Sequence, residues 1–204
     1  KITIHMIGNA HLDPVWRWRW TGGLDEAITT AFSAVKRLQE YPEFIFTRSD
    51  AWFHEQIEII HPELFAQIKH FIAQGRWQIV GGWYIQPDCN LPTEYSLLQQ
   101  ARIGNGYFQS RFGQTATVGY NVDSFGHAGS FPAILRRGGF DSYVFMRPQE
   151  HELELPGRLF RWQAVQDEST VLAFRILDCY CCGREKTIRI EDNIKRLLEE
   201  TDPA

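Results

Sequence analysis

ITIHMIGNAHLDP, the stretch from Ile2 to Pro14, begins with an apolar segment and ends with the polar residues His11 and Asp13 before Pro14. Ile2 to Ile7 is rich in β-branched residues and predicts a strand. His11 and Asp13 follow it, and side chains two positions apart in an extended segment point to the same side. Pro14 delays the start of a helix and stiffens the turn. A converging imidazole and carboxylate suit a divalent metal such as zinc, although an isolated pair of this kind is more often part of a surface loop.

Strand-like and helix-like segments alternate along the rest of the chain. Apolar spacing predicts helices over residues 24–39, 51–73 with a break at His61-Pro62, 93–112, 131–137 and 190–200. Strands are predicted over residues 44–47, 77–80, 116–120, 142–146, 159–164 and 170–176. This alternation predicts an α/β fold with a mainly parallel sheet, in one domain over residues 1–204. Catalytic residues of such folds follow the C-terminal ends of the strands.

The segment from Asn121 to His127 follows one of these strands. We expect Asp123 to face the same cavity as His11 and Asp13, where one carboxylate oxygen could bind a metal and the other attack carbon. The alternative is that Asp123 caps the helix that follows. His127 is interpreted as a structural hydrogen-bonding residue and not as a ligand.

Two further strand ends carry candidate residues. Gly81-Gly82 allows close backbone approach. After it, Trp83 or Tyr84 could stack on a sugar, and Asp88 and Asn90 could bond its hydroxyl groups. An ordinary turn with buried aromatic residues is the alternative. Arg147 follows another strand and could pair with a catalytic carboxylate and favour its ionised form, or could be a solvated arginine.

Seven tryptophans, among 14% aromatic residues, include three that alternate with arginines. Trp16 is close enough to Asp13 to form a flat platform for a sugar ring. Trp18 and Trp20 are expected to serve in packing. The net charge of -4 and the lack of a Lys/Arg run argue against nucleic acid and anionic membranes as partners.

The apolar runs are too short to span a bilayer, and residues 1–7 resemble no export signal. Three of the four cysteines crowd into Cys-x-Cys-Cys, a spacing unlike a zinc ribbon. Reduced thiols are expected for Cys89, Cys179, Cys181 and Cys182, and they indicate a cytoplasmic protein.

Four segments together resemble the family-38 glycoside hydrolases, the class II α-mannosidases. These segments are Asn9 to Trp16, Gly81 to Asp88, Asn121 to His127 and Gly138 to Phe140. They occur in the order and at separations similar to those of the family. The His-Leu-Asp variant resembles the bacterial and cytosolic branch.

The resemblance implies a seven-stranded β/α barrel and a retaining α-mannosidase that removes terminal mannose from oligosaccharides or glycoconjugates. It implies a zinc ion, or cobalt or another divalent ion, held by His11, Asp13 and Asp123. Asp123 would also be the nucleophile, and Trp16, Phe125 and Arg147 would line the sugar site. Retaining glycosidases place a carboxylate and a carboxylic acid about 5 Å apart across the scissile bond.

Members of the family are several times longer than this chain. The resemblance therefore implies that residues 1–204 are an N-terminal fragment whose barrel is incomplete at its C-terminus. The fourth metal ligand and the general acid/base are expected beyond Ala204, so the fragment alone is expected to be inactive. Exposed strand edges would favour a homo-oligomer. A metal-dependent carbohydrate deacetylase and a non-catalytic sugar-binding module remain alternatives.

Overall fold

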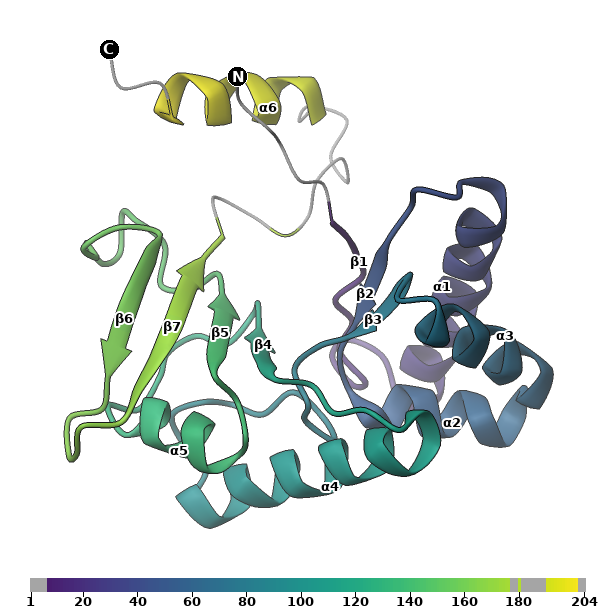
Figure 1. The fold of residues 1–204 in the computed structure, drawn as a ribbon, viewed down its shortest axis with the longest axis horizontal. Coiled ribbons are helices and arrows are strands. Elements are labelled where there is room, and N and C mark those ends of the chain that lie inside the picture. The colour runs from purple at the N-terminus through teal and green to yellow at the C-terminus, as the bar shows by residue number, and fades with distance from the viewer. Residues whose placement is uncertain (1–6, 177–179, 181–189, 202–204) are drawn as a thin grey trace.

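The computed structural model describes residues 7–176, 180 and 190–201 (Figure 1). Strands and helices alternate, as the sequence predicts. The strand predicted over Ile2 to Ile7 lies outside the described residues except for Ile7, which is not part of a strand. Their order is β1 (Gly8–Asn9), α1 (Trp20–Glu40), β2 (Phe46–Arg48), α2 (Ala51–Ile60), α3 (Pro62–Ala73), β3 (Trp77–Ile79), α4 (Glu94–Phe112), β4 (Val118–Asn121), α5 (Phe131–Arg137), β5 (Ser142–Phe145), β6 (Leu159–Gln163), β7 (Thr170–Arg175) and α6 (Ile190–Thr201). Within the described residues, no helix is long and apolar enough to cross a membrane.

The strands form two sheets. One has the parallel order β1-β2-β3, and the other has the order β4-β5-β7-β6, in which β6 alone is antiparallel to its neighbour. A backbone hydrogen bond of 2.8 Å from Gly81 to the Val118 carbonyl links the end of β3 to the start of β4. Gly81 has a φ of 81°, a conformation that glycine adopts without strain. The two sheets therefore meet at this turn.

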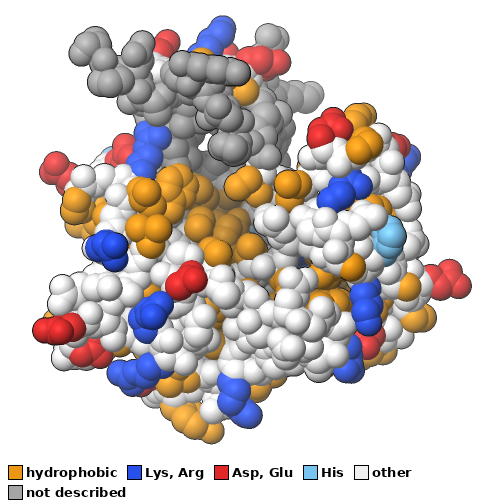
Figure 2. All heavy atoms as spheres, in the orientation of Figure 1, with side chains coloured by type: hydrophobic (Ala, Val, Ile, Leu, Met, Phe, Trp, Pro, Cys, Tyr) orange, Lys and Arg blue, Asp and Glu red, His pale blue; other side chains and the backbone are white. Residues whose placement is uncertain are grey.

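The predicted mixed α/β fold is confirmed, but the predicted seven-stranded barrel is not shown by the described strands. A closed barrel needs every strand paired on both sides, whereas β1 and β6 each pair on one side among the described residues. Figure 2 shows apolar side chains gathered over the upper ends of β6 and β7. Leu159 of β6 and Leu172 and Phe174 of β7 are exposed.

Two apolar clusters hold the helices against the sheets. The first packs α1, α2 and α3 against β2 and β3, with Leu38, Ile68 and Trp77 almost fully buried. The second packs α4 and α5 against β4 to β7, with Phe131 and Tyr143 fully buried. Each such side chain stabilises the fold by about 1.5–3 kcal/mol. The helices thus cover one face of the strands and leave the strand ends free to form a site.

Helix boundaries agree with the sequence at two places and differ at one. The break at His61-Pro62 separates α2 from α3, and the Thr93 hydroxyl caps α4 by accepting from the Ser96 amide at 3.3 Å. Helix α1, however, begins at Trp20 and not at the predicted Leu24, so no acidic residue lies in its first turn. The backbone turns at Arg19, whose carbonyl accepts from the amides of two glycines.

Candidate active site

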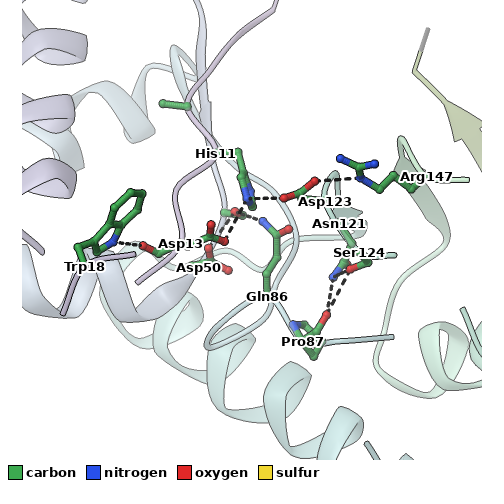
Figure 3. A network of polar contacts seen from close by, with 12 residues as sticks. His11, Asp13, Trp18, Asp50, Gln86, Pro87, Asn121, Asp123, Ser124 and Arg147 are labelled. Atoms are coloured by element: carbon green, nitrogen blue, oxygen red, sulfur yellow. Dashed lines mark hydrogen bonds and ion pairs between the residues drawn. The ribbon is translucent and has the colours of Figure 1, made fainter. Parts of the chain in front are cut away.

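A cleft of about 1060 Å³ opens at the C-terminal ends of the strands. Segments that follow β1 to β5 all contribute to its lining, as expected for a parallel α/β fold. Figure 3 shows the polar side chains at its centre. They include His11, Asp13, Asp50, Gln86, Asp123 and Arg147. The structure therefore brings together the metal-binding and nucleophile candidates, although they lie more than a hundred positions apart in the sequence.

His11 lies between the two candidate carboxylates. Its Nε2 atom is 3.4 Å from Asp13 Oδ1 and 3.8 Å from Asp123 Oδ2. Burial lowers the pKa of His11, and the nearby Arg48 lowers it further, while Asp13 and Asp123 oppose the change. The neutral imidazole is therefore favoured, and this is the form that donates a lone pair to a metal ion.

The two carboxylate oxygens of Asp123 face different residues. Arg147 Nε donates to Oδ1 at 3.0 Å, while Oδ2 faces His11. The guanidinium of Arg147 also lies 4.7 Å from the centre of the Phe125 ring. Asp123 does not cap the next helix, because α5 begins at Phe131. The capping alternative is therefore excluded, and so is that of a freely solvated Arg147.

The imidazole of His11 and the carboxylates of Asp13 and Asp123 are ligand types that zinc sites use. Two ligand atoms that each lie about 2.1 Å from a tetrahedral zinc are separated by about 3.4 Å. The distances from His11 Nε2 to the two carboxylates are close to this value. The Nδ1 atom of His11 is buried and has no hydrogen-bond partner among the described residues. Across the same residues, no group of three or more His, Cys, Asp or Glu side chains is arranged so that it could hold a metal ion.

Aromatic side chains lie at the rim of the cleft. Trp16 is 60% exposed and Phe125 is 78% exposed, and both line the cleft. Trp18 supports the site, because its Nε1 donates to the Asp13 carbonyl at 3.1 Å and its ring contacts Trp16 edge-on. The expectation that Trp20 serves in packing is wrong, since it is 55% exposed at the start of α1. Two flat apolar surfaces are therefore available to a ligand.

The structure places Trp83 in the core and not in the cleft, contrary to the prediction that it stacks on sugar. It is fully buried, and its Nε1 donates to Asn121 Oδ1 at 2.8 Å. Asp88 does line the cleft, but its Oδ1 accepts from the amides of Asn90 and Leu91, both at 2.8 Å. Asp88 thus stabilises a turn at the rim.

His127 and Cys89 are structural. His127 Nε2 lies 2.7 Å from the Tyr143 hydroxyl, and burial lowers the pKa of His127 to about 4. Cys89 is a free, buried thiol whose pKa burial raises to about 11. Cys179, Cys181 and Cys182 lie outside the described residues.

Four cleft or cleft-wall residues were missed at the sequence level: Arg48, Asp50, Gln86 and Tyr180. Asp50 follows β2 as Asp123 follows β4, so the same strand-end argument could have found it. Burial raises the pKa of Asp50 to about 6, against the opposing effect of Arg48. Tyr180 lies edge-on to His11, with ring centres 5.0 Å apart. No spacing in the sequence indicates Gln86 or Tyr180.

This chain is similar to known proteins of one family. The model of the glycosyl hydrolases family 38 N-terminal domain matches residues 1–202. Alpha-mannosidase G of Dictyostelium discoideum is 26% identical over 175 residues, which are 85% of this chain and 16% of that protein. Human alpha-mannosidase 2C1 is 26% identical over 87% of this chain and 17% of its own length.

A solved structure shares the fold. The crystal structure of an alpha-mannosidase from Enterococcus faecalis V583 superposes with a TM-score of 0.78 at 19% identity, covering 95% of this chain and 22% of that one. This chain thus spans about a sixth of the length of the curated relatives named above. The family match over residues 1–202 shows that the chain belongs to the N-terminal domain family of the family 38 glycosyl hydrolases.

Proposed function

We propose that this chain supplies part of the active site of a longer retaining α-mannosidase. The observation that carries the proposal is the placement of Asp123, whose two oxygens face Arg147 and His11 in a cleft at the strand ends. A carboxylate held in this way can direct one oxygen to an anomeric carbon. The names of the family relatives, which are α-mannosidases, support the substrate class.

In the first chemical step, an Asp123 oxygen forms a bond to the anomeric carbon of a terminal mannose as the bond to the leaving oxygen breaks. A carboxylic acid elsewhere in the enzyme donates its proton to that leaving oxygen. In the second step, water gives a proton back to the same carboxylate and attacks the anomeric carbon, which releases Asp123. Two displacements at one carbon retain its configuration.

Arg147 fixes the orientation of the Asp123 carboxylate, the proposed nucleophile. Its Nε–H bond to Oδ1 is charge-assisted, a class of bond that is stronger than one between neutral groups. The contact of its guanidinium with the Phe125 ring limits the conformations of both side chains. Asp123 therefore needs little rearrangement before attack, which is how positioned groups lower an activation barrier.

His11, Asp13 and Asp123 would hold a zinc ion, or cobalt or another divalent ion, in this proposal. A bound divalent ion would coordinate sugar hydroxyl groups and orient the sugar ring for attack. His11 contributes through its neutral ring, which burial favours. The carboxylates of Asp13 and Asp123 contribute the charges that such an ion requires.

Substrate binding is assigned to the rim. The exposed rings of Trp16 and Phe125 offer flat surfaces for the apolar faces of sugar rings. Asp88 lines the same cleft and retains an oxygen that can accept from a hydroxyl group. A mannose-terminated oligosaccharide is therefore the proposed substrate, and a seven-stranded barrel that continues both sheets from the link at Gly81 is the proposed framework.

The stereochemistry of hydrolysis tests this proposal. Proton NMR of the full-length enzyme acting on an aryl α-mannoside should show α-mannose as the first product. β-Mannose as the first product would exclude the double displacement. Release of acetate from an acetylated sugar, without mannose, would support the deacetylase, and sugar binding without either product would support a binding module. Asp123→Asn should abolish turnover, whereas Asp25→Asn, on the exposed face of α1, should not.

A further inference from the structure

Two charged residues at the end of β2, Arg48 and Asp50, are buried beside the cleft and have no part in the chemistry proposed above. Arg48 is 5% exposed and Asp50 is 3% exposed. Burying a charged side chain is unfavourable unless other groups compensate for its lost hydration. Two such residues next to a candidate metal site therefore require an explanation.

Arg48 holds the strand that precedes His11. Among the described residues, β1 pairs with β2 at Gly8 and Asn9. Side chains of β2 extend this attachment: Thr47 Oγ1 donates to the Gly8 carbonyl at 3.0 Å, and Arg48 Nη1 donates to the Ala10 carbonyl. Ala10 directly precedes His11, so Arg48 acts on the backbone from which the His11 side chain projects.

The other contacts of Arg48 fix its guanidinium in place. The guanidinium carbon lies 4.2 Å from the centre of the Phe53 ring, within the range of a cation–π interaction. Asp50 is the acidic residue with the largest electrostatic effect on Arg48, and it opposes the effect of burial on the pKa of Arg48. The guanidinium is therefore fixed by a ring on one element and by charge at the end of its own strand.

Asp50 adopts an unusual backbone conformation. Its φ of 65° makes it the one residue other than glycine with a positive φ in the described part of the chain. The Ser49 hydroxyl donates to its Oδ2 at 3.3 Å, and the Gln86 backbone amide also bonds to the carboxylate. Strained conformations of this kind concentrate at functional sites. The carboxylate also interacts electrostatically with Asp13, one of the proposed ligands.

Buried polar side-chain atoms without a hydrogen-bond partner are concentrated in the same three residues. Of six such atoms in the described structure, four belong to His11, Arg48 and Asp50, and the other two belong to Arg76 and Arg175. Buried polar groups are nearly always hydrogen-bonded, so each exception requires an explanation.

We infer that Arg48 and Asp50 are positioning residues, which hold the His11–Asp13 segment in the orientation that binds a metal ion. Arg48 fixes the backbone at Ala10, and Asp50 provides the opposite charge that keeps Arg48 buried at this place. The inference rests on the proposed function, because it assumes the metal site of that proposal. Neither residue contacts substrate or metal in this account.

Zinc affinity separates positioning from general stability. Zinc binding to metal-free full-length protein would be measured by competition with a chromogenic chelator, and the thermal midpoint of the metal-free protein by calorimetry. The variants are Arg48→Met, Arg48→Lys and Asp50→Asn. Arg76→Met is the matched control, because Arg76 also donates to backbone carbonyls and lies over a phenylalanine ring, but far from the cleft.

Arg48→Met should weaken zinc binding about tenfold or more, as loss of supporting contacts does at other metal sites. Arg48→Lys, which keeps the charge, should recover part of this loss. Asp50→Asn should also weaken binding, and it folds with little extra strain because asparagine tolerates a positive φ. Arg76→Met should lower the thermal midpoint and leave zinc affinity unchanged.

Unchanged zinc affinity in both Arg48→Met and Asp50→Asn would overturn the inference and leave the proposed function intact. Equal losses of affinity in Arg48→Met and Arg76→Met would also overturn it, because the effect would then be general destabilisation. If Arg48→Met does not fold, the zinc affinities of Arg48→Lys and Asp50→Asn decide between positioning and general stability. A wild-type protein that binds no divalent ion would contradict the metal site of the proposed function, and with it this inference.

Discussion

Arg147 Nε lies 3.0 Å from Asp123 Oδ1, on the side of the carboxylate opposite to the oxygen that faces His11. The two residues follow neighbouring parallel strands, β4 and β5. Their separation is therefore set by strand spacing and not by a flexible loop. This pairing is the geometric basis on which Asp123 is proposed as the nucleophile.

Replacing Arg147 should slow the reaction without unfolding the protein. Loss of a hydrogen bond to a charged group costs about 1.5–3 kcal/mol, which corresponds to a decrease in kcat/KM of roughly 10- to 150-fold. Arg147→Lys should recover little, because lysine cannot reproduce the directed Nε–H donor. Steady-state hydrolysis of an aryl mannoside measures kcat/KM for these variants. Arg102→Met, on the exposed face of α4, is the control, and equal activity of both variants would remove Arg147 from the mechanism.

Gly23 should be required for the loop that carries Asp13. A Cβ atom at Gly23 would lie 2.3 Å from the Pro14 carbonyl oxygen, which is far inside a van der Waals contact. Gly23→Ala should therefore lower the thermal midpoint and weaken zinc binding.

Gly106 in α4 offers the matched substitution, since a Cβ atom there meets nothing within 4 Å. Gly106→Ala should stabilise the protein by about 0.5–1 kcal/mol, because alanine favours the helix. Calorimetry of both variants checks the pair. A stabilising Gly23→Ala would show that the loop does not pack on α1 in this way.

Trp83 and Trp16 should respond to substitution in opposite ways. Trp83→Phe removes the hydrogen bond to Asn121 inside the core, so stability should fall while KM stays unchanged. Trp16→Ala removes an exposed ring at the cleft, so KM should rise while stability stays unchanged. Thermal denaturation and steady-state kinetics measure the two effects. A raised KM in Trp83→Phe, with an unchanged KM in Trp16→Ala, would instead indicate that Trp83 is the sugar platform.

His127 should make stability depend on pH. Burial lowers the pKa of folded His127 from 6.5 to about 4. Between these values the unfolded chain binds the proton more readily, so stability falls as the pH drops from about 6.5 toward about 4. His127→Gln should reduce this loss without abolishing it, because the pKa of buried His54 is lowered in the same way.

Thermal midpoints at about pH 7 and about pH 5 measure the effect. His70→Gln, at an exposed position on α3, should keep the pH dependence of the wild type. A His127→Gln variant with the same dependence as the wild type would show that His127 is not held neutral by burial.

Much of the fold was predictable, because apolar periodicity marks each helix and strand locally. Helix α5 begins and ends where the spacing predicts, and Thr93 caps α4 as expected. The start of α1 was missed, because Gly22 and Gly23 usually favour a turn, whereas in the structure Gly23 packs against Pro14 and Gly22 lies next to Trp18. Barrel closure depends on the pairing of distant strands, which local patterns do not encode.

The site was predictable where a functional side chain directly follows a strand, as His11 and Asp123 do. Trp83 shows the limit of this rule, because position alone does not reveal whether a ring turns toward the cleft or the core. Arg48 is the last residue of β2, and charged residues are usually solvent-exposed. Its role depends on the carbonyl of a residue 38 positions earlier, and no spacing in the sequence indicates that contact.

The central claim is that Asp123 is the catalytic nucleophile, and covalent trapping tests it most directly. Full-length enzyme would be incubated with a fluorinated mannosyl donor whose second step is slow, then digested and analysed by mass spectrometry. If Asp123 is the nucleophile, one fluoromannosyl adduct should form on the peptide that contains Asp123, and none in Asp123→Asn. An adduct on a different carboxylate, or full hydrolytic activity in Asp123→Asn, would contradict it.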